Sequence, residues 1–326
     1  MNHRTRLENC LSGGAVDRPP VALWRHFPVD DQSPADLAAA TLDFQRMFDF
    51  DFVKVTPASS FCLKDWGVDD EWRGHTEGTR DYTRAVIHHP EDWLQLPVLD
   101  ATRGHLAAQL ECLRLVVGEL GDKTPVLQTI FNPLAQAKHL VGDDRQLAVH
   151  LRLYPEAVRS ALSTIVESTR RFIEAAQQTG IAGIFFAVQH AQYSLLSAAE
   201  YETFGRFYDL QVLESAQGLW LNLLHLHGEG VMFEMLADYP LVALNWHDRE
   251  TPPSLATAQG RFPGAVCGGL RRWETMVVGT PVQVAAEARE AIQSTGGRRF
   301  ILGTGCVLPI IAPRANIIAA RQAVEG

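Results

Sequence analysis

Residues 180–189 read GIAGIFFAVQ and contain no charged side chain. Continuous apolar runs of this length are typical of parallel strands that helices cover on both faces. A helical pattern precedes the run: from about Pro155 onward, apolar residues form one stripe, and the pattern stops near Gly180. The stretch therefore predicts a helix followed by a buried strand, which is the repeating unit of an α/β fold.

Seven further runs of the same kind are spread along the chain. They lie at residues 20–27, 51–57, 124–131, 219–227, 241–247, 264–270 and 298–306. Helix start signals stand between them, at Ser33-Pro34, at Ser197 and at Thr280-Pro281. Eight strand–helix units predict an α/β fold that closes as a (β/α)8 TIM barrel, with residues 1–326 in a single domain. The alternative is a doubly wound open sheet, but no glycine-rich phosphate loop follows the first strand.

One segment interrupts this rhythm. Residues 58–123 are too many for an ordinary connection between a strand and a helix. Residues 71–93 have the pattern of a hairpin that turns around Gly78, and a helix is expected from about Ala101. The sequence thus predicts a hairpin and a helix inserted after strand two, placed either as a lid over the barrel mouth or against the barrel wall.

Composition excludes several classes of partner. The chain of 326 residues carries a formal net charge of −9, and it has no run of Lys or Arg. Nucleic acid and anionic membrane surfaces are therefore not expected as partners. No apolar stretch is long enough to span a bilayer, and the start lacks the apolar segment of a signal peptide. The five scattered cysteines do not form a disulfide framework, so we expect a cytoplasmic protein.

Polar side chains gather where the predicted strands end, which is where barrel enzymes carry their active sites. These residues are Arg25, His26, Asn132, Gln189, His190, His225, His227, His247, Asp248, Cys267 and Cys306. His225 and His227 are two positions apart, so on a strand they face the same side. With Cys306 they form a candidate three-ligand zinc site with an open fourth position. The alternative is a hydrogen-bonded histidine pair beside a buried free thiol.

Four segments give a family resemblance. RLENCLSGGAVDRPPVALWR (6–25), GTPVQVAAEAREAI (279–292), RFILGTGCVLP (299–309) and APRANIIAARQAV (312–324) resemble sequences of the uroporphyrinogen decarboxylase superfamily. The resemblance spans the chain, is strongest after about residue 180, and implies a (β/α)8 barrel. The superfamily holds decarboxylases and also zinc-dependent methyltransferases that move methyl groups between corrinoid proteins and thiols.

The chain is more similar to the methyltransferase branch than to the decarboxylases. Decarboxylases have RQAGRY after strand one, where this chain has RHFPVD with only Arg25, and their last-strand histidine is Thr304 here. The methyltransferases carry His-x-Cys after strand five and Cys after strand eight. HLH therefore matches His225 to the first ligand and places His227 where the first cysteine stands, while Cys306 matches the last. One thiolate instead of two would leave the zinc site with one positive charge.

The resemblance implies a zinc-dependent methyl- or alkyltransferase that acts on a thiol or on a corrinoid-linked methyl group. In this interpretation His225, His227 and Cys306 bind the metal, and Arg25 binds an anionic group of the substrate. The remaining candidates orient substrate or move protons, and they are Gln189, His190, His247 and Asp248. A small-molecule substrate and a corrinoid carried by a partner protein are expected. A divergent decarboxylase, or a non-catalytic barrel that binds a tetrapyrrole or corrinoid, remain alternatives.

Overall fold

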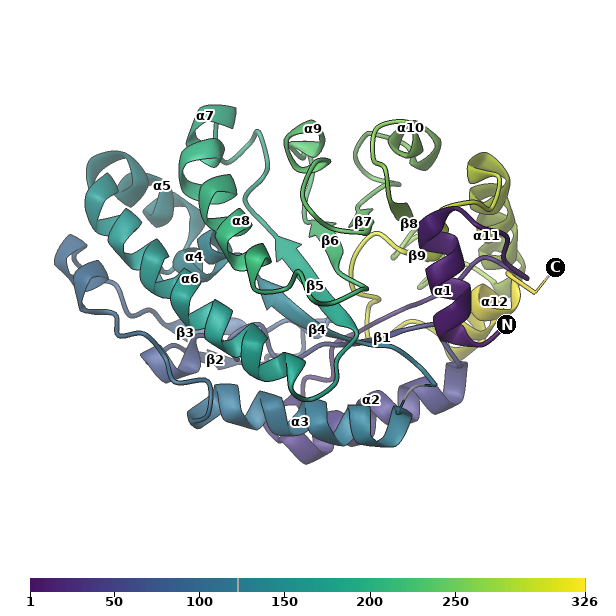
Figure 1. The fold of residues 1–326 in the computed structure, drawn as a ribbon, viewed down its shortest axis with the longest axis horizontal. Helices are drawn as coiled ribbons and strands as arrows, with labels where there is room; N and C mark the ends of the chain where they lie inside the picture. Colours follow the sequence, from purple (N-terminus) through teal and green to yellow (C-terminus); the bar gives the residue numbers. More distant parts are fainter. Residues whose placement is uncertain (122, 326) are drawn as a thin grey trace.

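A computed structural model describes residues 1–121 and 123–325 and places seven parallel strands in one curled sheet. The strand order follows the chain as β1-β4-β5-β6-β7-β8-β9. The strands are β1 Val53–Val55, β4 Val126–Phe131, β5 Gly183–Val188, β6 Leu223–Leu226, β7 Ala243–Trp246, β8 Ala265–Leu270 and β9 Phe300–Thr304. Figure 1 shows these strands at the centre of the molecule with helices around them. The predicted α/β barrel fold is confirmed.

Residues 20–24 close the ring between the last strand and the first. Val21 forms a parallel bridge with Leu302, and its carbonyl accepts a hydrogen bond of 2.9 Å from the Asp51 amide just before β1. The sequence predicts a full strand over 20–27, and the structure corrects this to a single bridge. Prolines at 19 and 20 have no amide proton to donate, which limits pairing before Val21. After Val21, the Thr304 carbonyl of β9 accepts its hydrogen bond from the Asn245 side chain.

Helices follow the strands on the outside of the barrel. They are α1 His3–Ser12, α2 Pro34–Phe48, α3 Gly104–Leu120, α4 Pro133–Val141, α5 Asp144–Leu153, α6 Pro155–Gln177, α7 Ala198–Tyr201, α8 Phe207–Glu214, α9 Phe233–Leu236, α10 Leu255–Gln259, α11 Pro281–Thr295 and α12 Arg314–Gln322. The described residues also form short 3-10 helices and one π-helical turn. The 3-10 helices are η1 Asp30–Gln32, η2 Lys64–Trp66 and η3 Pro90–Gln95, and the π-helical turn is η4 Glu202–Arg206. None of the described helices combines the length and the apolarity that crossing a membrane requires.

The predicted helix starts are confirmed. Ser33 accepts a hydrogen bond from the Asp36 amide at the start of α2, and full capping boxes begin α7 at Ser197 and α11 at Thr280. In α6, one stripe of apolar side chains is buried against the core, as its spacing predicts.

The inserted segment contains an antiparallel hairpin, β2 Asp69–Glu71 with β3 Asp81–Arg84. Its loop contains Gly78 at φ 80°, and a Cβ there would lie 2.6 Å from the Cβ of His26. This close approach fixes the loop against the segment that closes the barrel, beside the mouth. The predicted second arm is too long, because Pro90 begins η3. The predicted helix starts at Gly104, and as α3 it packs on α2 and β4, so it is the outer helix of a barrel unit.

Candidate metal centre

Three imidazoles and one thiol meet at the carboxyl ends of β6, β7 and β9. His225 lies in β6, His227 follows it, His247 follows β7, and Cys306 follows β9. One ligand atom of each lies within 4.8 Å of those of the others. The Cys306 sulfur is 3.6 Å from Nε2 of His225 and 3.6 Å from Nδ1 of His227. The predicted trio is therefore brought together, and the structure adds His247 to it.

Local backbone geometry explains why these side chains converge. His225 and His227 are two residues apart, so both point to the same side of the chain. The chain between β9 and Cys306 passes close to the end of β7, because a Cβ on Gly305 would lie only 2.7 Å from the Cα of His247. A side chain at residue 305 would push the thiol away from the imidazoles. We conclude that Gly305 is required for this close approach.

Hydrogen bonds to neighbouring side chains orient two of the imidazoles. The amide nitrogen of Asn245 donates to the carbonyls of Cys267 and Thr304 at 2.9 and 3.0 Å, so its oxygen faces His225. That oxygen lies 2.7 Å from Nδ1 of His225. Nδ1 therefore carries the ring proton, and Nε2 keeps a lone pair that can bind a metal.

His247 is oriented in the same way by a carboxylate. Its Nδ1 lies 2.8 Å from Glu250, which accepts the Nδ1 proton, so Nε2 is the ring nitrogen left for a metal. Nε2 is buried and has no hydrogen-bond partner among the described residues. A carboxylate or amide that holds the second ring nitrogen is the usual support of a metal-binding histidine.

The thiol of Cys306 is buried, but its pKa lies well below the ordinary value. Burial acts to raise this pKa, and the nearby imidazoles of His225, His227 and His247 outweigh burial. A thiolate is the form that binds metals. The distances also suit a metal: tetrahedral zinc with bonds of about 2.1 Å to nitrogen and 2.3 Å to sulfur separates those two atoms by about 3.6 Å. The four side chains could therefore hold a zinc ion.

A cavity of about 800 Å³ opens onto this cluster. Gln189 and His190 line it, as the sequence predicts for substrate-binding residues. Nε2 of His190 lies 2.8 Å from Asp144, while its Nδ1 is buried without a partner among the described residues. Tyr82 of the inserted hairpin also lines the cavity, so the hairpin contributes to the wall of the mouth.

Two predicted site residues lie outside this cavity. The Arg25 guanidinium stacks at 5.0 and 5.1 Å from the ring centroids of Phe27 and Phe44, beside α2. The side chain of Asp248 accepts hydrogen bonds from the Gly269 amide, between β7 and β8, and burial raises its pKa to about 7. Side chains alternate along an extended chain, so the neighbours His26 and His247 face the mouth instead.

Sequence reasoning missed other residues of the cavity. Lys54 and Thr56 of the β1 region line it, together with Thr129 of β4. Lys54 had a signal in the sequence, because DFVKVTP is a buried-strand pattern with one ammonium group in its middle. Asn245 carried no such signal, since its role depends on the pairing of β6 with β7.

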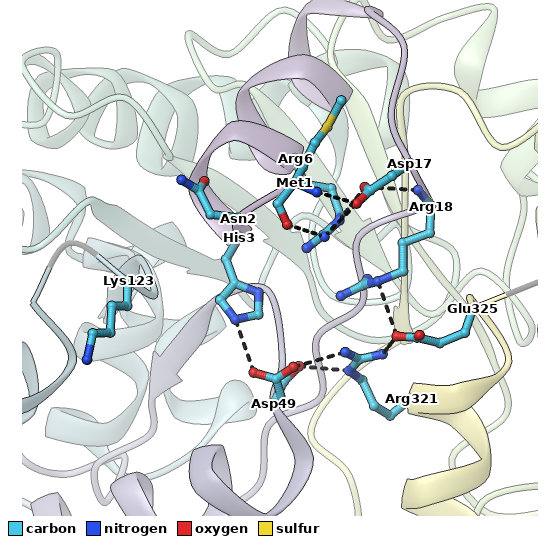
Figure 2. Close-up of a pocket in the computed structure, with 10 residues that line it drawn as sticks. All are labelled: Met1, Asn2, His3, Arg6, Asp17, Arg18, Asp49, Lys123, Arg321 and Glu325. Carbon is cyan, nitrogen blue, oxygen red and sulfur yellow. Dashed lines mark hydrogen bonds and ion pairs between the residues drawn. The ribbon is translucent and has the colours of Figure 1, made fainter.

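A second polar pocket, of about 650 Å³, lies at the other end of the barrel around α1 (Figure 2). Next to it, the buried carboxylate of Asp51 accepts hydrogen bonds of 2.5 Å from Arg6, 2.8 Å from Arg18 and 2.7 Å from the Val21 amide. Burial acts to raise the pKa of Asp51, but hydrogen bonds from His3 and Arg18 outweigh burial and hold it at about 2. Most charged groups at this end form ion pairs, among them Arg6 with Asp17 and Arg321 with Asp49.

Comparison with known proteins identifies relatives of the whole chain. The family model described as uroporphyrinogen decarboxylase (URO-D) matches residues 2–326. A methylcobamide:CoM methyltransferase MtbA of Methanosarcina acetivorans is 21% identical over 236 residues, which cover 72% of this chain and 68% of the relative. The MtbA of Methanosarcina mazei is 22% identical over 239 residues, with the same two coverages of 72% and 68%.

Solved structures share the fold at low sequence identity. A methyltransferase from Methanosarcina mazei superposes with a TM-score of 0.86 at 18% identity, over 99% of this chain and 98% of that one. A B12-independent methionine synthase from Shewanella sp. W3-18-1 gives a TM-score of 0.61 at 14% identity, over 96% and 95%. At these identities the likeness concerns the fold, so the chemistry must be argued from the residues.

Proposed function

Because the chain belongs to the uroporphyrinogen decarboxylase (URO-D) family and its relatives include methyltransferases, we propose that it is a zinc-dependent methyl- or alkyltransferase with a thiol acceptor. The observation that carries this proposal is the group of three imidazoles and one thiol in the barrel mouth. Among the described residues, no other group of His, Cys, Asp or Glu side chains brings three or more ligand atoms this close together.

The donor set suits zinc. Imidazole and thiolate select borderline-soft ions over magnesium or calcium, which prefer oxygen. We propose His225, His227 and Cys306 as ligands, through Nε2, Nδ1 and Sγ. The sequence suggested that His247 orients substrate or moves protons. We propose it instead as a fourth ligand, through nitrogen, available until a substrate takes that position. A bound zinc ion supplies a Lewis acid that lowers the pKa of a thiol in contact with it.

The rest of the cavity would hold the acceptor in place. Gln189 and His190 stand in the wall, where they can donate or accept hydrogen bonds to the acceptor. Asp144 fixes the His190 ring, so its free Nδ1 faces a constant direction. In the reaction a carbon–sulfur bond forms and the bond between the methyl carbon and its donor breaks. The donor keeps the electron pair, and the thiol proton is released. From the relatives' names we propose a methylated corrinoid, carried by a partner protein, as the donor.

A decarboxylase finds less support in the geometry. Arg25, the arginine that this alternative retains, lies outside the cavity. Thr304, at the position of the decarboxylase histidine, is fully buried and donates a hydrogen bond to the carbonyl of Cys306. This hydroxyl therefore supports the chain at the thiol instead of facing a substrate.

The proposal is tested by methyl transfer. Zinc-loaded protein is incubated with methylcobalamin and a set of small thiols, and thioether formation is followed by mass spectrometry. We expect thioether from the wild type and none above background from Cys306→Ala. Absence of thioether from every thiol, with zinc present in every chain, would overturn the proposal. Formation of coproporphyrinogen from uroporphyrinogen would support a decarboxylase instead.

A further inference from the structure

Lys54 is a buried cation that the metal cluster does not use. It lies in the middle of β1, is 7% exposed, and lines the same cavity as His225 and Cys306. Its ammonium group donates a hydrogen bond of 3.1 Å to the Thr56 hydroxyl. Among the described residues, no carboxylate oxygen lies within 4.0 Å of it. Burying an ammonium group without a counter-charge is costly, which argues for a role that needs the charge.

Three carboxylates of the cavity wall are engaged elsewhere, and a fourth, Asp81, lies 3.9 Å from Arg73. Glu77 pairs with Arg272 at 2.7 Å, and Asp144 lies 2.8 Å from His190. Asp143 caps α5 through a hydrogen bond from the Gln146 amide. Among the described residues, Cys306 is the group whose negative charge acts on Lys54, and a bound zinc ion would engage that thiolate, so an anionic ligand would supply the counter-charge. Burial lowers the pKa of Lys54 to about 7, against the opposing effect of Cys306, so an anionic ligand would strengthen its charged form.

Lys54 stands at a short distance from the metal cluster. Its Nζ lies 4.6 Å from the centroid of the Phe185 ring, and the same ring stacks on His225 at 5.3 Å between centroids. One aromatic ring therefore connects the ammonium group and the first imidazole. A small molecule lying along this ring can reach the metal cluster with one end and Lys54 with the other.

The charges of the cavity define the acceptor further. A divalent ion held by one thiolate and neutral imidazoles keeps one positive charge, and Lys54 adds a second. A thiolate alone would neutralise only one of the two. A thiolate with a second anionic group would neutralise both, in a buried place where unpaired charge is costly.

We propose that Lys54 binds an anionic group, a sulfonate or carboxylate, at the far end of the acceptor thiol and so determines which thiols are accepted. This inference rests on the proposed function, because it places the sulfur of the acceptor at the metal cluster. It also replaces the expectation that Arg25 binds the anionic group.

The test compares two thiols that differ in one group. Zinc-loaded protein is titrated calorimetrically with 2-sulfanylethanesulfonate and with the neutral 2-sulfanylethanol. We expect the wild type to bind the sulfonate at least about tenfold more tightly, as one charge-assisted contact gives. Lys54→Met, which keeps the alkyl chain, should bind both thiols with similar affinity and leave the neutral thiol unaffected. Lys54→Gln provides the same test should Lys54→Met fail to fold.

Lys123→Met is the matched control, since it removes the same charge from the opposite end of the barrel. It should keep the full preference. Equal affinities for the two thiols in the wild type, or a preserved preference in Lys54→Met and Lys54→Gln, would overturn the role of Lys54. If neither thiol binds to protein that holds a full equivalent of zinc, the proposed function itself fails, and the inference falls with it.

Discussion

The two ends of the barrel both collect charged and polar side chains, but they use them differently. At the amino end, Asp51 is surrounded by donors. In the pocket beside it, Asp17 pairs with Arg6 and Asp49 pairs with Arg321 (Figure 2). At the carboxyl end, Nε2 of His247 and Nδ1 of His190 are buried without partners among the described residues, and Lys54 has no carboxylate. A satisfied cluster stabilises the fold by itself, whereas an unsatisfied one gains by binding a ligand. We therefore assign structure to the first and function to the second.

The largest effect is expected at the amino end. Asp51→Ala removes the carboxylate that joins α1, residue 21 and β1, and leaves Arg6 and Arg18 without their buried partner. Losing one member of a buried ion pair costs about 3–5 kcal/mol, so the free energy of unfolding should fall by that amount in urea titrations. Zinc content of the folded protein should not change. Asp43→Ala, an exposed pair with Arg46, is the control and should cost less than about 0.5 kcal/mol. A loss below about 1 kcal/mol for Asp51→Ala would contradict the structural assignment.

A third polar cluster surrounds Asp209, and its contribution to the stability of the fold should depend on pH. Asp209 is buried and accepts hydrogen bonds from Tyr201, Tyr239 and Asn132. Burial raises its pKa from 3.8 to about 6, although these hydrogen bonds act to lower it. Because the folded pKa is the higher one, its contribution to stability is complete below about pH 3.8 and is lost as pH rises through about 6. At about 1.4 kcal/mol per pH unit the change amounts to about 3 kcal/mol.

Unfolding free energies of wild type and Asp209→Asn, measured between pH 4 and 7, test this. The wild type should lose stability relative to the variant as pH rises, because asparagine does not titrate. A difference that stays constant across this range would show that the pKa of Asp209 is not raised. Zinc binding should be the same in both proteins, because Asp209 makes no contact with the metal cluster.

A smaller effect is expected from two asparagines at opposite ends of neighbouring strands. Asn245 holds the ring of His225, whereas Asn222 accepts a hydrogen bond from the Ile184 amide of β5 and donates one to the Ala216 carbonyl. Asn245→Ala should weaken zinc affinity by about 10- to 100-fold in chelator competition, as loss of such a supporting contact does. Asn222→Ala should lower stability and leave zinc affinity unchanged. Equal zinc affinities in the two variants would show that the hydrogen bond between Asn245 and His225 does not support metal binding.

Much of the fold could be predicted because strand and helix patterns are local. The alternation of apolar runs with capped helices gave seven strands and the helices α2, α6 and α11. The strand predicted at 20–27 was overestimated, because apolar composition does not show that the Thr304 carbonyl of β9 binds the Asn245 side chain. The helix α3 was assigned to the insertion for a similar reason, since its contact with α2 is a tertiary property.

The site was predictable only in part. The spacing of His225 and His227 places both on one face, and the strand-end position of Cys306 brings it to the mouth. His247 was expected to handle substrate, because only the pairing of β6 with β7 shows how near it lies to the thiol. Adjacent polar residues such as Arg25 and His26 must face opposite sides, and the sequence does not say which of them faces the cavity.

The central claim is that the unsatisfied cluster in the barrel mouth binds zinc. Its most direct test is the zinc content of purified protein after reconstitution and removal of loosely bound metal, measured by elemental analysis for the wild type and Cys306→Ala. We predict about one equivalent per chain for the wild type, and a large loss for a Cys306→Ala variant that keeps the circular dichroism of the wild type. Less than about a tenth of an equivalent in the wild type, or equal zinc in both proteins, would contradict the account.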